Sequence, residues 1–422
     1  MGKCKGKQKA KANSAGPCRA ASSPCASSKS AGATGAVCPV EHFENMIPNC
    51  FEYATAAKQA GRPIVGIMCE FTPREVIMAA GGVPVCLCGG SADTIPAAEE
   101  HLPANLCPLI KSTYGYHVQG ANPFLEMADL VVTETTCDGK KKMYELMAQT
   151  RPMHVLELPQ KQDQPEALDR WAGEIRGLKD VLEARFDVSI TDDKLREAIE
   201  VMNHERALRR ELADLMKQDR PPITGRQLLD FKSIISGIGA DLEQYARAIE
   251  MYRAQAGEQA GSPPVRVLVT GVPMAHGAER VMDLIEGHGG LVVCMESCTG
   301  VKPILEDVDA GSSDPIRAVA EKYYHLPCSV MTVNERRMES LRRLAAEFRP
   351  QCVIELVWQA CLTYDVESYR VRQWVEKELE IPYLRIETDY SPSDSARISL
   401  RVEALFETAR RRVPAAGGQG DA

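Results

Sequence analysis

The sequence lacks the features that would place it in a membrane, outside the cell or on nucleic acid. No apolar run approaches the roughly 18 residues needed to cross a bilayer. The first twelve residues are basic but contain no hydrophobic core, so they do not resemble a secretory signal. The 58 acidic side chains outnumber the 50 basic ones, whereas binding to phosphates by counterion release needs a basic surface. The sequence therefore predicts a cytoplasmic protein with neither a membrane nor a nucleic acid as partner.

Two kinds of short motif are also missing. Neither Gly-x-Gly-x-x-Gly nor Gly-x-x-x-x-Gly-Lys follows a predicted strand, so the chain does not indicate direct nucleotide binding. There is no Cys-x-x-Cys pair, although structural zinc sites usually contain such chelating pairs. If ATP takes part in the function, we expect a partner to bind it.

Cysteine, by contrast, is abundant, with 15 residues in 422. In a reducing compartment cysteines serve metals or catalysis more often than disulfides. Some of them have the sequence surroundings of small buried hydrophobic residues: Cys50, Cys86, Cys88, Cys294 and Cys352. Others lie in or at the edge of a basic, Ala/Ser-rich N-terminal segment, where a metal-delivery role stays open: Cys4, Cys18, Cys25 and Cys38. Six cysteines remain as candidates for chemistry.

The order of short apolar runs predicts an α/β fold. Runs of strand type alternate with helical segments in two separate series. The first series comprises residues 63–68, 83–87, 129–134 and 154–158, and the second 265–270, 290–295, 351–357 and 382–386. We therefore expect two Rossmann-like, doubly wound domains, each with a parallel sheet.

Between the two series, apolar residues recur at helical spacing after a predicted N-cap at Thr191. No strand pattern interrupts this segment, and it offers no candidate for chemistry. The predicted organisation is a disordered tail (1–40), an N-terminal α/β cluster-binding domain (41–164), a helical segment (165–262), a C-terminal α/β cluster-binding domain (263–414) and a second tail (415–422).

Each predicted α/β domain places three cysteines in loops at or just beyond strands. In the first domain these are Cys69, Cys107 and Cys137, and in the second they are Cys298, Cys328 and Cys361. In open α/β sheets, ligands bind at the carboxyl edge of the strands. If the two edges face each other, six thiolates could converge on one interface.

Six soft thiolate ligands favour iron–sulfur clusters or zinc. Isolated cysteines from separate loops suit a large cluster better than one zinc ion, which usually takes close ligand pairs. A four-iron cubane normally takes four thiolates. Three per cubane would leave one iron open to a substrate or a bridging sulfide, as a catalytic cluster requires.

Several segments resemble the 2-hydroxyacyl-CoA dehydratase family. They are residues 66–75 (GIMCEFTPRE), 79–84 (AAGGVP), 107–112 (CPLIKS), 136–142 (TCDGKKK), 361–367 (CLTYDVE) and 381–389 (IPYLRIETD). The resemblance implies two Rossmann-like domains that hold a four-iron cluster on Cys107, Cys137 and Cys361. It also implies that the chain works in a heterodimer of dehydratase subunits, which receives electrons from an ATP-dependent iron–sulfur activator.

The three further cysteines, Cys69, Cys298 and Cys328, make the chain similar to the double-cubane branch of that family. This branch implies a homodimer in which one subunit holds two four-iron cubanes joined by a bridging sulfide, an [8Fe-9S]-type cluster. It implies an anaerobic, ATP-driven reduction of small molecules such as acetylene, and leaves the physiological substrate open.

A reduction consumes protons as well as electrons. The candidate proton donors close to the cysteines in sequence are Glu70, His117 and Asp138. Lysines near the candidate ligands could offset an anionic cluster: Lys111, Lys140, Lys141, Lys142 and Lys302.

We therefore predict an iron–sulfur oxidoreductase with a double-cubane cluster. The first alternative is a 2-hydroxyacyl-CoA dehydratase subunit with a single [4Fe-4S] cluster. Another is an electron-transfer or cluster-storage protein, and zinc binding is the weakest.

Overall fold

The computed structural model describes residues 37–255 and 263–412. Most of the predicted N-terminal tail, with Cys4, Cys18 and Cys25, lies outside the described residues, as does the tail at 415–422. The first helix, α1 (Pro39–Glu44), begins two residues before the predicted start of the folded part at residue 41, and Pro39 and Phe43 are buried.

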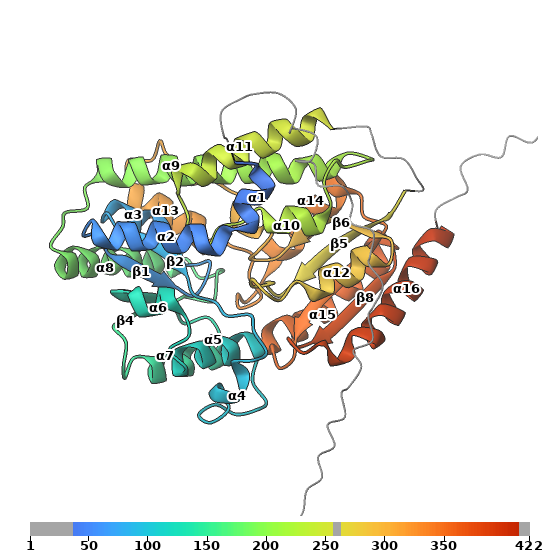
Figure 1. Ribbon diagram of the computed structural model, residues 1–422, viewed down its shortest axis with the longest axis horizontal. Helices are drawn as coiled ribbons and strands as arrows, with labels where there is room; N and C mark the ends of the chain where they lie inside the picture. The colour runs from blue at the N-terminus through green and yellow to red at the C-terminus, as the bar shows by residue number, and fades with distance from the viewer. Residues whose placement is uncertain (1–36, 256–262, 413–422) are drawn as a thin grey trace, which may run out of the picture.

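The described residues contain two four-stranded sheets, which lie at the left and right of Figure 1. The first has the order β2-β1-β3-β4, and the second has the order β6-β5-β7-β8. The strands are β1 (Ile64–Ile67), β2 (Val83–Cys86), β3 (Leu130–Glu134), β4 (Met153–Leu156), β5 (Val265–Gly271), β6 (Gly290–Glu296), β7 (Cys352–Trp358) and β8 (Tyr383–Thr388). Every neighbouring pair of strands is parallel. The two sheets repeat one topology, which confirms the predicted α/β fold.

Helices alternate with these strands along the chain. Those of the first series are α2 (Met46–Gln59), α3 (Arg74–Ala79), α4 (Ile95–Ala98), α5 (Pro108–Val118), α6 (Pro123–Met127) and α7 (Asp138–Met147). Those of the second series are α12 (Arg280–Gly287), α13 (Pro315–Tyr324), α14 (Glu335–Phe348), α15 (Leu362–Trp374) and α16 (Ser395–Arg412). A short π-helical turn, Val375–Leu379, extends α15.

The predicted helical region between the sheets is also present. It consists of α8 (Ala167–Phe186), α9 (Asp192–Asp214), α10 (Gly225–Asp230) and α11 (Gly239–Ala254), and α9 and α11 run along the top of Figure 1. Thr191 caps α9 as its sequence predicts, because its hydroxyl accepts a hydrogen bond from the Lys194 amide. Asp192 and Asp193 follow in the first turn, where negative charge suits the helix dipole.

Replacing Thr191 with Ala is expected to lower the free energy of unfolding by about 1 kcal/mol, since the variant loses the N-cap hydrogen bond. Urea denaturation followed by circular dichroism measures the change. Ser189→Ala, at an exposed position just before the cap, is the matched control and should leave the midpoint unchanged. An equal loss in both variants would contradict a capping role.

The hydrophobic cores connect the two sheets instead of separating them. One core cluster contains Ile64 and Val131 of the first sheet together with Val267 and Trp358 of the second. A second cluster joins residues of β1 and β3 to α8, α9 and α13. Helix α13 belongs to the C-terminal series in sequence, yet it packs with α8 and α9 beside the N-terminal sheet. The two sheets are therefore held in a fixed relation by shared apolar packing.

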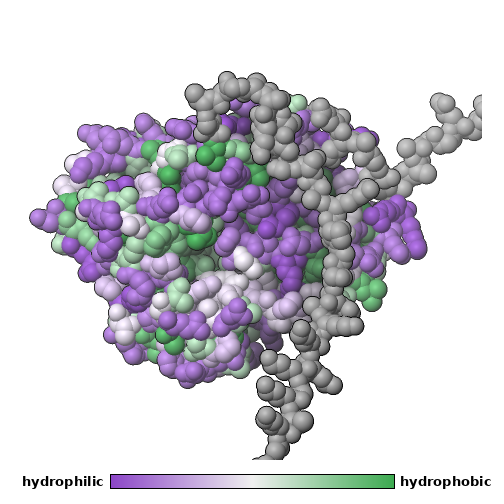
Figure 2. All heavy atoms as spheres, in the orientation of Figure 1, coloured by the Kyte–Doolittle hydropathy of each residue, from purple (hydrophilic) through white to green (hydrophobic). Residues whose placement is uncertain are grey.

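The visible face in Figure 2 is mostly hydrophilic, with hydrophobic residues in small groups. Among the described residues, no helix combines the length and apolar character that a bilayer span requires.

Candidate metal centre

Four of the six candidate cysteines follow the carboxyl ends of strands, as predicted, whereas Cys107 lies between α4 and α5 and Cys328 lies between α13 and α14. In the first sheet, Cys69 follows β1 and Cys137 follows β3. These two strands are adjacent, and the chain crosses from one side of β1 to the other between them. Such a switch point is where open α/β sheets form ligand crevices. In the second sheet, Cys298 follows β6 and Cys361 follows β7.

Cys107, Cys137 and Cys361 form a first trio, and each is the N-cap residue of a helix: α5, α7 and α15 respectively. The thiols of Cys107 and Cys361 interact with each other, and Cys137 lies within electrostatic range of both. The contact with Cys361 lowers the pKa of Cys107, helped by backbone amides of α5 and opposed by burial. Three helix N-termini, each with a partial positive charge, therefore meet at sulfur atoms.

Cys69, Cys298 and Cys328 form a second trio. Cys69 lies within electrostatic range of the other two, and Cys298 lies within range of Cys328. Burial raises the pKa of Cys298 to about 12 and the pKa of Cys69 well above its ordinary value. Cys137 of the first trio lies within range of Cys328 of the second. The two trios are thus neighbours, and each draws cysteines from both sheets.

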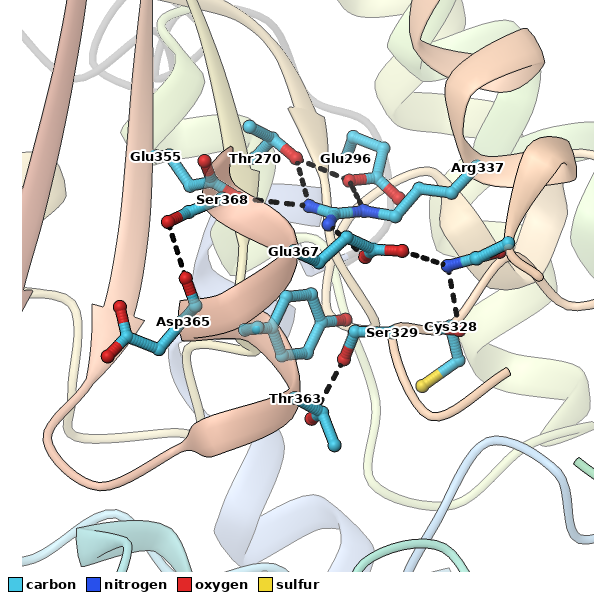
Figure 3. Close-up of polar contacts among 12 residues, drawn as sticks. Thr270, Glu296, Cys328, Ser329, Arg337, Glu355, Thr363, Asp365, Glu367 and Ser368 are labelled. Carbon is cyan, nitrogen blue, oxygen red and sulfur yellow. Dashed lines mark hydrogen bonds and ion pairs between the residues drawn. The ribbon is translucent and has the colours of Figure 1, made fainter. Parts of the chain in front are cut away.

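A buried charge network fixes the C-terminal loops that carry these cysteines (Figure 3). Arg337 of α14 is fully buried and contacts Glu296, Glu355 and Glu367. Glu296 ends β6 just before Cys298, and Glu367 lies on α15, which Cys361 caps. The network therefore connects the C-terminal end of β6 and helix α15 to the same guanidinium.

Asn334 extends this network to the remaining loop. Its side-chain amide donates to the Cys328 carbonyl at 2.9 Å and to Glu367 at 2.8 Å. The position of Cys328 is consequently coupled to that of α15. Ion pairs and hydrogen bonds of Arg337 and Asn334 therefore connect the segments that carry the three C-terminal cysteines.

Two of the five lysines predicted to offset negative charge lie beside the cysteines. Lys140 donates to the Met68 carbonyl at 2.7 Å. Although burial opposes its charged form, Tyr144 and nearby thiols raise the pKa of Lys140. Lys302 is buried, pairs with Glu296 at 3.0 Å and donates to the Tyr364 hydroxyl at 2.8 Å. The other three lysines are paired with glutamate or aspartate: Lys111 with Glu99, Lys141 with Asp138 and Lys142 with Glu145.

This donor set fits an iron–sulfur cluster better than a mononuclear metal. Within residues 37–255 and 263–412, no three Cys, His, Asp or Glu side chains are arranged to hold one metal ion. A cubane is bound differently, because each thiolate binds a separate iron. Two neighbouring thiol trios, with helix N-termini and lysines around them, match the charge and softness of such a cluster.

The three candidate proton donors lie in different places. Glu70 lines a cavity beside Cys69 and Cys298, where it pairs with Arg74 at 2.9 Å. The Asp138 side chain is 96% exposed and pairs with Lys141. His117 lies near the far end of α5 from Cys107, beside the Thr150 hydroxyl. Of the three, the structure brings only Glu70 to the cysteines.

Some residues at this cavity did not stand out in the sequence. Cys86 and Cys88, predicted to be core cysteines, are only half-buried, contact each other and line the cavity. Cys50, Cys294 and Cys352 are buried as predicted. The helical region was expected to carry no chemistry, but Arg206 and Arg209 of α9 line the same cavity. Helix α9 packs on α3, and the absence of chemistry on the helical region stays a prediction.

The acidic members of the buried networks had a sequence signal that could have identified them. Glu134, Glu296 and Glu355 each lie within or at the end of an apolar strand run and are fully buried. A carboxylate in such a run needs a partner. Glu134 accepts a hydrogen bond from Thr72, and burial raises the pKa of Glu134 to about 8.

Fold and site together define a class of protein: a two-sheet α/β protein whose facing loops gather cysteines at one crevice. The chain belongs to the 2-hydroxyglutaryl-CoA dehydratase, D-component family, whose model matches residues 69–409. This places it among relatives of 2-hydroxyacyl-CoA dehydratase subunits.

Individual relatives agree with this assignment. The chain is 40% identical over 359 residues to YjiM of Escherichia coli (strain K12), a protein named only provisionally as a dehydratase subunit, covering 83% of this chain and 92% of that one. It is 23% identical to lactoyl-CoA dehydratase subunit beta of Anaerotignum propionicum, with the same coverage. It is 22% identical to the (R)-phenyllactyl-CoA dehydratase beta subunit of Clostridium sporogenes, covering 87% of this chain and 97% of that one.

Proposed function

We propose that this protein is an iron–sulfur reductase that holds a double-cubane, [8Fe-9S]-type cluster. The ligands are Cys107, Cys137 and Cys361 for one cubane and Cys69, Cys298 and Cys328 for the other. An ATP-dependent iron–sulfur activator supplies low-potential electrons, and the chain works as a homodimer in the cytoplasm. Its substrates are small molecules.

The observation that carries this proposal is the neighbourhood of the two thiol trios. Each trio has the three ligands that leave one iron of a cubane without a protein thiolate. The proximity of Cys137 to Cys328 puts the trios beside each other. When bound, such a cluster supplies low-potential electrons and an open iron position for a small substrate.

The surrounding residues have separable tasks in this proposal. The N-termini of α5, α7 and α15 and the Lys140 ammonium offset the negative charge of the thiolates. Glu70, within the cavity beside Cys298, is the proton donor that the geometry favours. The Arg337 network holds the C-terminal ligands in place.

A second candidate function is a 2-hydroxyacyl-CoA dehydratase subunit with a single [4Fe-4S] cluster on Cys107, Cys137 and Cys361. The names of the dehydratase relatives favour it. Under this function Cys69, Cys298 and Cys328 bind no iron and a different second subunit is needed. A pure electron-transfer or cluster-storage protein would show no turnover.

Anaerobically purified protein is expected to contain about eight irons per chain, because two cubanes are present. Iron and acid-labile sulfide analysis measures this content, and light scattering measures the oligomeric state. With its activator and ATP, the homodimer should reduce acetylene to ethylene, using two electrons and two protons per molecule. About four irons per chain, together with activity only after addition of a second subunit, would favour the dehydratase.

A further inference from the structure

A cavity of about 160 Å³ lies where the two sheets and the helical region meet. One side of it carries Cys69 and Cys298, together with Cys86 and Cys88. The rest of the lining is partly apolar, with Met202, Ile234 and Ile304 among its residues, and strongly basic. None of the functions above says what this cavity binds.

The charges of the lining are unequal. Six cationic side chains face two carboxylates, Glu70 and Glu205. The cations are Arg74, Lys140, Arg206, Arg209, Lys232 and Lys322. Two further carboxylates outside the lining, Glu75 and Glu279, also pair with these cations. The remaining excess of two cations favours a negatively charged occupant.

Most of these cations already have anionic neighbours. Arg74 pairs with Glu70 at 2.9 Å, Arg206 with Glu75 and Arg209 with Glu205. Lys232 pairs with Glu279 at 3.4 Å. Lys140 lies beside the thiols of the proposed cluster ligands.

Lys322 of α13 is different. The residue is only 6% exposed, and within the described residues no carboxylate lies at ion-pair distance from its ammonium. Its ammonium donates to the Pro303 carbonyl at 3.1 Å and lies 4.2 Å from the centre of the Tyr323 ring. An ammonium has three donors, so two are left for a ligand.

The neighbourhood of Lys322 also disfavours a lone positive charge. Burial and the nearby Arg206 lower the pKa of Lys322 well below its ordinary value. Lysines are almost never buried unless paired. An anion in the cavity would supply the missing partner and restore the charged, donating form.

The volume limits the size of that anion. A cavity of about 150 Å³ accommodates a molecule the size of benzene, so a cavity of about 160 Å³ has room for a small organic anion. A cluster bound at the cysteine side would take part of this space. The remaining room suits a carboxylate with a body of a few carbon atoms, which the apolar lining can contact.

We propose that the cavity binds a short-chain carboxylate and that the Lys322 ammonium is its principal hydrogen-bond donor. The binding of a carboxylate is independent of the proposed function. Only the role of this carboxylate as the substrate beside the cluster rests on that function. The carboxylate enters as a free acid anion, not as a thioester.

The test is calorimetric titration of the anaerobically purified full-length protein with sodium acetate at constant ionic strength. Acetamide, which is neutral and nearly isosteric, is the control ligand. Lys322→Met removes the ammonium and keeps an unbranched side chain, and an apolar residue at a buried site is compatible with folding. We expect Lys322→Met to weaken acetate binding by about ten-fold or more, as loss of a charge-assisted hydrogen bond does.

Lys142→Met is the matched control, because the Lys142 side chain is 73% exposed, and it should bind acetate as the wild type does. Equal affinity for acetate and acetamide, or unchanged acetate affinity in Lys322→Met, would overturn the inference. If nitrate binds more tightly than acetate, the site prefers an inorganic oxyanion, and the inference of a carboxylate ligand is wrong.

Iron analysis of the same samples separates this inference from the proposed function. About eight irons per chain without acetate binding rejects the carboxylate site alone, whereas acetate binding at about four irons rejects the double cubane alone.

Discussion

Replacing Cys298 with Ala is expected to lower the iron content from about eight to about four per chain, because one cubane loses a third of its protein ligands. Cys298 lies in the trio with Cys69 and Cys328, which the single-cluster alternative does not use. The trio of Cys107, Cys137 and Cys361 is complete in the variant and should retain its iron. Iron and sulfide analysis, with electron paramagnetic resonance of the reduced protein, measures the change.

Cys294→Ala is the matched control for this experiment. Cys294 lies in β6, four residues before Cys298, and is buried among apolar residues. Its replacement tests whether any cysteine lost from this strand and loop destabilises the site. We expect an iron content equal to that of the wild type. If wild type and Cys298→Ala both contain about four irons, the double-cubane proposal is wrong and the dehydratase function replaces it.

Replacing Arg337 with Met should lower the free energy of unfolding by about 3–5 kcal/mol, as breaking a buried ion pair does. Arg337, Glu296 and Glu355 all have fully buried side chains. Without the guanidinium, Glu355 keeps the Tyr383 hydroxyl at 2.7 Å and Glu296 keeps Lys302, but the carboxylates outnumber the cations. Urea denaturation under anaerobic conditions measures the loss.

The pH dependence gives this prediction a second readout. Burial already raises the pKa of Glu355, and Arg337 opposes that rise. Loss of Arg337 raises the pKa of Glu355 further. A carboxyl group whose pKa is higher in the folded than in the unfolded protein makes the protein less stable as pH rises. The difference in the free energy of unfolding between the wild type and Arg337→Met should therefore become smaller when pH falls from about 8 to about 6.

Arg342→Met is the control on the same helix. Arg342 pairs with Glu378 at 2.9 Å, but both side chains are about half exposed, so its loss should cost no more than about 1 kcal/mol. Equal losses in both variants, or normal stability of Arg337→Met, would show that the buried network does not stabilise the fold. Loss of iron in Arg337→Met at a temperature where the protein stays folded would assign Arg337 a positioning role for the ligand loops.

Much of the fold could be predicted because its signals are local. Apolar runs of strand length lie at every strand from β1 to β8, and Thr191 caps α9 through its own side chain. The placement of Cys69, Cys137, Cys298 and Cys361 after strands follows from the same runs. Hydrophobic periodicity and capping depend on residues a few positions apart, so the sequence states them directly.

The sequence by itself determined the order of elements, the parallel α/β class and the position of four candidate cysteines after strands. Only the tertiary structure decided which thiols lie together, that α9 and α13 bring Arg206 and Lys322 to one cavity, and that His117 and Asp138 point elsewhere. Each of these results depends on side chains from distant parts of the chain, brought together by the shared packing of the two sheets and the helical region. Local patterns carry no information on such contacts, because burial and ion pairing are decided by what packs against an element.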